Sequence, residues 1–443
     1  MKLGQVQSKL LARTQKSILD WIEIICAIII CFNFSYTTNP VFNPNFKVIA
    51  AVYGVWFILT YLRHSSHLVK ILKLTWPLLL WSGIVFFRHL IVPSKQSVLV
   101  YCVTLLLFVG LAYWYIEQRD FFSIRILMIT FIIGWLICSV VSLTLIRIHP
   151  NVLRGISSGE FSLEGKYAGA GSFGFVYSLP YICIVLALIT FHYLKRYRET
   201  KIRLWLVIGC VAAVIDILFF VVLVQAKFIM AYLLFFLGLI MLFIFYGQRI
   251  KRLLVVLGAG AIAYVPLAHL LLVVADHTAN RFIKVRFYEM GNLMLGRLFL
   301  ASEQSAILGR GGVFKDILDV IRHYPILGAA GREGQFLFHH DFQWLGDYAL
   351  YGIFIILPLF FIFFQWYRFI KNKTNDTFCR NQLAAFFFMI GLHGLINRLN
   401  ANELLATLFI FMPFVIIYFS NLDGVNKKLK IDFKEQADDN RGK

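Results

Sequence analysis

Hydrophobic residues occur in long runs along most of the chain, and short polar stretches separate these runs. A helix needs about 17 to 25 mostly apolar residues to cross the core of a bilayer. The runs therefore predict an all-α, polytopic membrane protein with about twelve transmembrane helices. Their approximate positions are 18–34, 46–62, 73–92, 97–116, 123–146, 172–192, 204–224, 228–247, 253–275, 350–369, 382–397 and 402–420.

Composition agrees with this pattern and narrows the class of partners. Hydrophobic residues make up 60% of the chain, and the mean hydropathy is +0.75. The net charge of +20 is typical of cytoplasmic loops that lie beside anionic lipids, so we expect membrane lipids and no nucleic acid as partners. The seven cysteines lie in predicted spans or in one cytoplasmic loop, and their positions predict neither an extracytoplasmic disulfide nor a metal site.

Basic residues alternate between the loops. With a cytoplasmic N-terminus, the stretches KRYRETKIR, QRIKR, RFIKNKTND and KKLK all fall on the cytoplasmic side. Both termini are therefore predicted to be cytoplasmic. The first run follows a basic start and has no small-residue cleavage site, so we expect the first span to be retained.

Two predicted outer segments differ from the short connectors. Residues 147–171 form a polar loop after the fifth span, and residues 276–349 are far too many for a simple connection. The stretch GGVFKDILDVIRHYP has apolar residues at helical spacing and ends in proline, which predicts a helix. We therefore expect a large helical periplasmic loop between the ninth and tenth spans. The predicted division is 1–275 for nine spans, 276–349 for this loop, 350–420 for three spans and 421–443 for a cytoplasmic tail.

Candidate site residues gather in the predicted outer segments. Arg310, between two glycines, is expected just before a helix start, where a guanidinium and helix dipole together suit a pyrophosphate. Lys227 is expected at an outer span boundary, where it could bind phosphate or extend to lipid headgroups. His340, with His339 and Asp341 beside it, could accept a proton from a sugar hydroxyl. The simpler interpretations are that Arg310 caps a loop and that His340 is a surface histidine without a role.

Several polar residues lie inside apolar runs. Glu23, Asp216, His269 and His393 are interpreted as satisfied packing residues, because no repeat or pairing of them is visible. The Arg398 and Glu403 pair is a turn contact or part of the rim of the site. No DxD or histidine-rich cluster occurs, so we expect no metal.

Together these motifs resemble the O-antigen ligase and polymerase superfamily of integral membrane glycan transferases. The resemblance covers roughly residues 147–420. The stretch GRGGVFKDILDVIRHYPILGAAG resembles the family's arginine-headed helix with its terminal turn at 325–328, which carries the family arginine onto Arg310. The stretch FHHDFQWLGDYALYGIF resembles the loop-closing motif and carries its histidine onto His340, although His339 fits an alternative alignment. Two departures are Asp341 after the histidine and Lys227 in VQAK where the family has arginine.

The resemblance implies a donor, an acceptor and a location. The donor is a glycan linked by pyrophosphate to undecaprenol, and the acceptor is lipid A-core for a ligase or a lipid-linked glycan for a polymerase. Arg310 and Lys227 would bind the pyrophosphate, Arg332, His339 and Asp341 would add further contacts, and His340 would take the acceptor proton. No cofactor is implied.

The implied enzyme is an inverting, metal-independent glycosyltransferase in a bacterial inner membrane, with a periplasmic site. The ligase is slightly preferred because the stretch GAGSFGFVYS and the single large loop resemble that branch. A repeat-unit polymerase of the same superfamily is the alternative. A multi-span transporter or flippase is a further alternative, although no internal repeat is visible.

Overall fold

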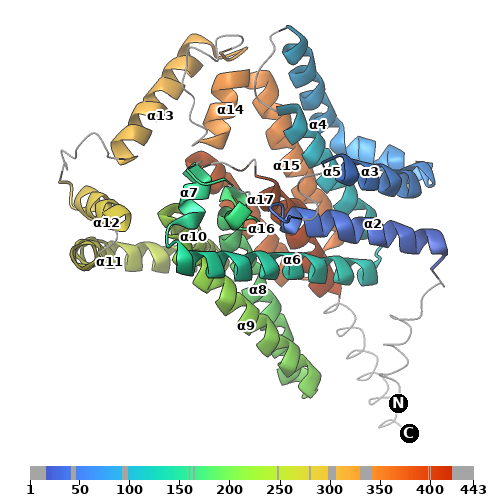
Figure 1. The fold of residues 1–443 in the computed structure, drawn as a ribbon, viewed down its shortest axis with the longest axis horizontal. Helices are drawn as coiled ribbons and strands as arrows, with labels where there is room; N and C mark the ends of the chain where they lie inside the picture. The colour runs from blue at the N-terminus through green and yellow to red at the C-terminus, as the bar shows by residue number, and fades with distance from the viewer. Residues whose placement is uncertain are drawn as a thin grey trace.

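A computed structural model gives the arrangement of most of the chain (Figure 1). It describes residues 16–40, 46–91, 98–158, 160–162, 165–246, 249–278, 281–297, 306–329, 342–397, 399 and 401–421. The described part is helical throughout and contains no strand, which confirms the all-α prediction.

The helices follow the predicted apolar runs closely, and each of the twelve runs coincides with a helix or a pair of consecutive helical segments. The helices within the runs are α2 (Ile18–Ser35), α3 (Phe46–Phe57) with η1 (Ile58–Leu62), α4 (Ser65–Ile91), α5 (Val98–Glu117), α6 (Phe121–Ile148), α8 (Phe173–Thr200), α9 (Arg203–Ala226), α10 (Ile229–Phe245), α11 (Arg249–His277), α15 (Ile353–Lys373), α16 (Thr377–Ile396) and α17 (Asn402–Ala406) with η4 (Thr407–Phe411). The helix of α17 and η4 continues to Asn421. Between the runs lie α7 (Val152–Ser158), η2 (Gly165–Tyr167), α12 (Arg281–Met294), α13 (Ala306–His323) and α14 (Gln343–Tyr351).

Length and composition identify the chain as a helical membrane protein. Among the described residues, six helices are long and apolar enough to cross a bilayer, namely α2, α6, α8, α9, α11 and the segment Asn402–Asn421. A seventh crossing is possible if the pair Val48–Leu62 and Ser65–Ile84, which meet at 106°, forms one broken span. This number refers to the described residues alone, so the twelve predicted spans stay a prediction.

The core of the bundle surrounds α8. Its N-cap is Ser172, whose hydroxyl accepts a hydrogen bond from the backbone N–H of Phe175, and its C-cap is Lys201 in the left-handed conformation. Helices α9, α10 and α17 pack against it. Most of its apolar window is therefore buried in protein, whereas most of α11 is exposed.

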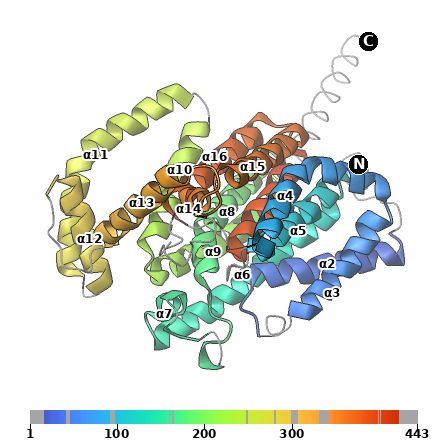
Figure 2. The ribbon, with the colours of Figure 1, turned by 90° about the horizontal axis from the view of Figure 1, so that it is seen from above.

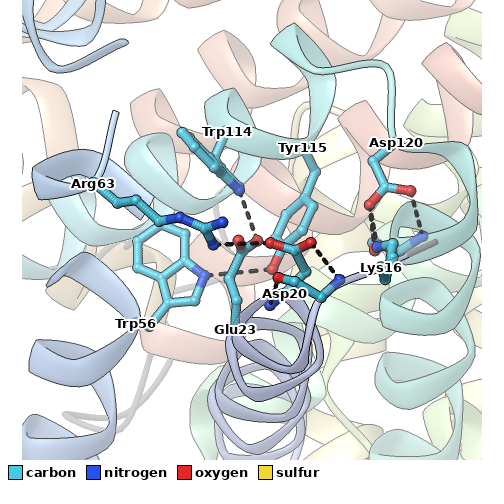
Figure 3. Close-up of polar contacts among 10 residues, drawn as sticks. Lys16, Asp20, Glu23, Trp56, Arg63, Trp114, Tyr115 and Asp120 are labelled. Atoms are coloured by element: carbon cyan, nitrogen blue, oxygen red, sulfur yellow. Dashed lines mark hydrogen bonds and ion pairs between the residues drawn. The ribbon is translucent and has the colours of Figure 1, made fainter. Parts of the chain in front are cut away.

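One end of the bundle, which we call the basic end, is defined by Lys16, Arg63, Lys70 and Lys373. Figure 3 shows Lys16 and Arg63 with their acidic partners. Lys16 Nζ lies 2.6 Å from Asp120 Oδ2. Lys70 and Lys373 both pair with Glu117, at 3.6 and 2.7 Å. These ion pairs join the start of α2, the α4 helix, the α5–α6 connection and the end of α15.

Two helix pairs lie at the periphery. Helix α12 folds back along α11, and Figure 2 shows the two side by side, at a distance from α2 and α3. The hydroxyl of Tyr288 donates a hydrogen bond to Asp276 and fixes that turn. Helix α13 packs against α14 (Figure 1). The two share a small separate core formed by Ile317, Val320, Ala329 and Ala349.

Candidate functional site

A buried carboxylate, Glu403, joins three segments at the end of the bundle opposite the basic end. Its Oε1 accepts hydrogen bonds from the hydroxyls of Thr37, in the α2–α3 loop, and of Ser172, the latter at 2.6 Å. Only 5% of Glu403 is exposed. Its Oε2 occupies the space beside Gly174, where a Cβ would lie 2.2 Å away. We call this the Glu403 end, defined by Thr37, Ser172 and Glu403.

A second polar group lies one helix away, in the last turn of α16. His393 is fully buried, its Nδ1 is 3.0 Å from the hydroxyl of Tyr181, and the Tyr181 ring stacks on the imidazole. Four residues further on, Asn397 is also buried. His393 Nε2 and Asn397 Nδ2 have no hydrogen-bond partner among the described residues. Because buried polar atoms usually have hydrogen-bond partners, these two atoms mark this region as a candidate functional site.

Helix α14 is fastened to this same region. The side-chain oxygen of Gln343 accepts a hydrogen bond from the backbone of Leu399 at 3.0 Å, and its amide donates to Asp347 at 2.6 Å. Trp344 Nε1 donates to the carbonyl of Gly391 at 2.8 Å, and its ring covers Gly394. The first turn of α14 is thus held against the connection between α16 and α17.

The turn after α13 docks on the break between α14 and α15. Ala329 N donates to the carbonyl of Ala349 at 2.7 Å. Gly328 and Gly352 both have a positive φ, of 66° and 75°, and neither has room for a Cβ. The P-I-L-G turn noted in the sequence is therefore a docking element for this helix break.

The Glu403 end also carries basic residues from α7 and α12. Arg286, in α12, pairs with the buried Glu289 at 2.9 Å. Burial, together with the positive charge of Arg286, lowers the pKa of the Arg154 guanidinium in α7 from its usual range. The positive charge of Arg286 therefore lies close enough to act on Arg154, so this end of the bundle holds two basic side chains near each other.

Lys227 lies at this end, between α9 and α10, so its predicted position at a helix boundary is confirmed. It forms the C-cap of α9 with a φ of 61°, and its amine donates to the carbonyl of Pro150 at 3.2 Å and to Asn151 Oδ1 at 3.4 Å. Its contacts thus join the α9–α10 turn to the loop after α6. The predicted phosphate contact stays a prediction.

Arg310 lies inside α13, which begins at Ala306, so the prediction of a helix start just after this arginine is wrong. The apolar residues Ala306, Ile307 and Leu308 extend the helix backwards although each glycine in it costs about 1 kcal/mol relative to alanine. The other predicted site residues, Arg332, His339, His340 and Asp341, lie outside the described residues.

The contacts of Glu403 and His393 could not be predicted from the sequence. There, Glu403 is interpreted as a turn contact or part of the rim of the site, and His393 as a packing residue. Their partners lie 366, 231 and 212 positions away in the chain, so no local spacing could reveal them. The one available signal was the presence of ionisable residues in apolar runs.

No protein-family model matches the chain, and no curated protein matches it.

Proposed function

We propose that this protein is a glycan transferase of a bacterial inner membrane, with about twelve spans and with both termini in the cytoplasm. It would move a saccharide from an undecaprenyl-pyrophosphate donor to an acceptor hydroxyl at the periplasmic face. The O-antigen ligase type, with lipid A-core as acceptor, is preferred to the repeat-unit polymerase. The alternation of charges supports this orientation, because the segments with predicted cytoplasmic charges, such as those of Lys16, Arg63 and Lys373, lie together at the basic end.

One observation carries the proposal. The long segment predicted as a periplasmic loop has its own helices, and its last helix, α14, is fixed by Gln343 and Trp344 to the α16–α17 connection. Beside that connection lie the buried polar groups of His393, Asn397 and Glu403. A folded segment that meets buried polar groups at one membrane face is suited to positioning a substrate.

The basic residues supply the electrostatics that such a donor needs. Arg154, Arg286 and Lys227 lie in segments on the predicted periplasmic side, and the charge of Arg286 acts on Arg154. A pyrophosphate at the outer membrane face would receive charge-assisted hydrogen bonds from residues of this kind. We place Arg310 and Lys227 among its ligands.

The proposed reaction is a single displacement at the anomeric carbon. The acceptor oxygen attacks that carbon, its proton passes to His340, and the bond from the carbon to the pyrophosphate oxygen breaks with inversion. Lys227 and Arg310 stabilise the charge that develops on the leaving pyrophosphate. Arg332, His339 and Asp341 hold the glycan, and the scheme requires no metal or nucleotide.

Complementation of a deletion strain tests the proposal. His340→Ala is expected to lower transfer by about 10²–10⁴-fold, and Arg310→Ala by about 10–100-fold. His323→Ala and Arg322→Ala are matched controls, because both side chains are exposed on α13. Loss of all long-chain lipopolysaccharide with lipid-linked chains intact would indicate a ligase, and a core with one repeat would indicate a polymerase. Full rescue by both site variants at normal protein levels would contradict the proposed site and favour transport.

A further inference from the structure

Asp216 lies in the middle of α9, ten residues before the helix ends at Ala226. It shares one face of the helix with three buried residues at helical spacing, namely Ala212, Phe219 and Leu223. This face packs against α8. The carboxyl therefore lies in an apolar helix interface at a depth that α9, as a membrane-crossing helix, places within the bilayer.

The groups around this carboxyl provide little compensation for a charge. The thiol of Cys183, in α8, is within hydrogen-bonding reach of it. Oδ1 is enclosed and has no hydrogen-bond partner among the described residues. Helices α6, α8 and α10 are the described elements that pack on α9. Among their titratable and charged groups, Cys183 is the one that acts on the Asp216 carboxyl.

Two buried carboxyls of the chain have stronger donors than the half-buried Asp216. Glu23, in α2, receives a hydrogen bond from Trp114 Nε1 at 2.7 Å (Figure 3). Glu403 receives two hydroxyls. An ionised carboxylate in apolar surroundings, with one weak thiol donor and no cation, is too costly, so the group takes up a proton instead.

We propose that Asp216 is a proton-binding site within the membrane, held as the neutral carboxylic acid by the α8–α9 interface. Its ligand in the cell is a proton. The same state makes it a modification site for a hydrophobic carbodiimide. In that addition the acid proton moves to a carbodiimide nitrogen, and the carboxyl oxygen bonds to the central carbon, so nothing leaves. The inference does not depend on the proposed glycan transfer.

The experiment uses the full-length protein in native membranes at pH 7. Dicyclohexylcarbodiimide, which partitions into the bilayer, is compared with a water-soluble carbodiimide, and labelled peptides are identified by mass spectrometry. We expect Asp216 to gain one dicyclohexylcarbodiimide and no water-soluble reagent, and we expect Asp216→Asn to lose the label. Asp319, half-exposed on α13, is the internal control that the water-soluble reagent should label.

A second measurement covers the case in which the reagent cannot reach the carboxyl. The infrared carbonyl band of a protonated carboxylic acid should be present in the wild-type protein at pH 7 and reduced in Asp216→Asn. Absence of that difference would overturn the proposal, and so would labelling of Asp216 by the water-soluble reagent to the same extent as Asp319.

Discussion

Gly328 and Gly352 meet backbone to backbone. A Cβ on Gly352 would lie 2.8 Å from the nitrogen of Gly328 and 2.0 Å from the carbonyl oxygen of Ile326. A Cβ on Gly328 would lie 2.6 Å from the carbonyl of Leu350. The turn after α13 and the start of α15 can therefore approach this closely because neither glycine has a side chain.

Gly352→Ala should therefore destabilise the protein by about 2–4 kcal/mol, because it combines left-handed strain with backbone overlap. Gly328→Ala should have a similar effect. Gly346→Ala is the matched control, since its Cβ meets nothing within 4 Å and alanine favours the α14 helix. Thermal unfolding in detergent measures all three variants. Equal melting temperatures for Gly352→Ala and Gly346→Ala would show that the turn does not dock as described.

Glu403→Ala should cost about 2–4 kcal/mol, because the hydroxyls of Thr37 and Ser172 lose their acceptor in a partly buried site. Glu403→Gln keeps an acceptor and should retain most of the stability. Gly174→Ala should reproduce the effect of Glu403→Ala, since its Cβ would displace Oε2. Gly391→Ala, with open space around its Cβ, is the control for an added methyl group, and chemical unfolding in mild detergent is the measurement.

Lys227→Gly should separate stability from activity. The left-handed backbone at this position favours glycine, which offsets the loss of two hydrogen bonds, so the unfolding free energy should stay within about 1 kcal/mol of wild type. If the amine also contacts the pyrophosphate, transfer should fall by roughly 10–100-fold. Lys201→Gly, at the left-handed C-cap of α8, should leave both quantities unchanged. A stable Lys227→Gly with normal transfer would remove Lys227 from the proposed site.

The Lys16–Asp120 pair should give a pH-dependent stability. Burial raises the pKa of Asp120. Hydrogen bonds from Lys16 and Ser123 and the charge of Lys16 lower it by more, so the pKa lies below the usual 3.8. A lowered pKa means that the contribution is complete above the unfolded value near 4 and is lost as the pH falls through the folded pKa.

Asp120→Asn should therefore be less stable than wild type by about 1–2 kcal/mol from pH 7 down to pH 5, and the difference should shrink below pH 4. Melting temperatures of both proteins across this range provide the measurement. A difference that grows as the pH falls would contradict the assigned ion pair.

The sequence predicted the helices well because apolar runs of bilayer length have few other stable conformations. It misplaced two starts. Helix α4 begins at Ser65 rather than near residue 73, because its basic first turns form ion pairs and need not stay outside the helix. Helix α13 begins at Ala306, before Arg310, although glycines flank that arginine and are typical of helix ends.

The site was less predictable than the helices. Lys227 could be placed at a helix boundary because it lies between two apolar runs of bilayer length. The contacts of Glu403, His393 and Gln343 could not be predicted, since each depends on how distant helices pack. Packing of this kind leaves no periodic trace in one sequence.

The burial of α8 has a consequence for biosynthesis. Its partners include α17, which the ribosome completes more than 200 residues later. Until then the hydroxyl of Ser172 lacks Glu403, and the His393 imidazole lacks its place beside Tyr181. Until α16 and α17 are inserted, α8 must therefore lie in the bilayer with the polar groups of Ser172 and Tyr181 unpaired with these partners. A chain that stops before Asn402 would keep Ser172 without Glu403 and would be a substrate for membrane quality control.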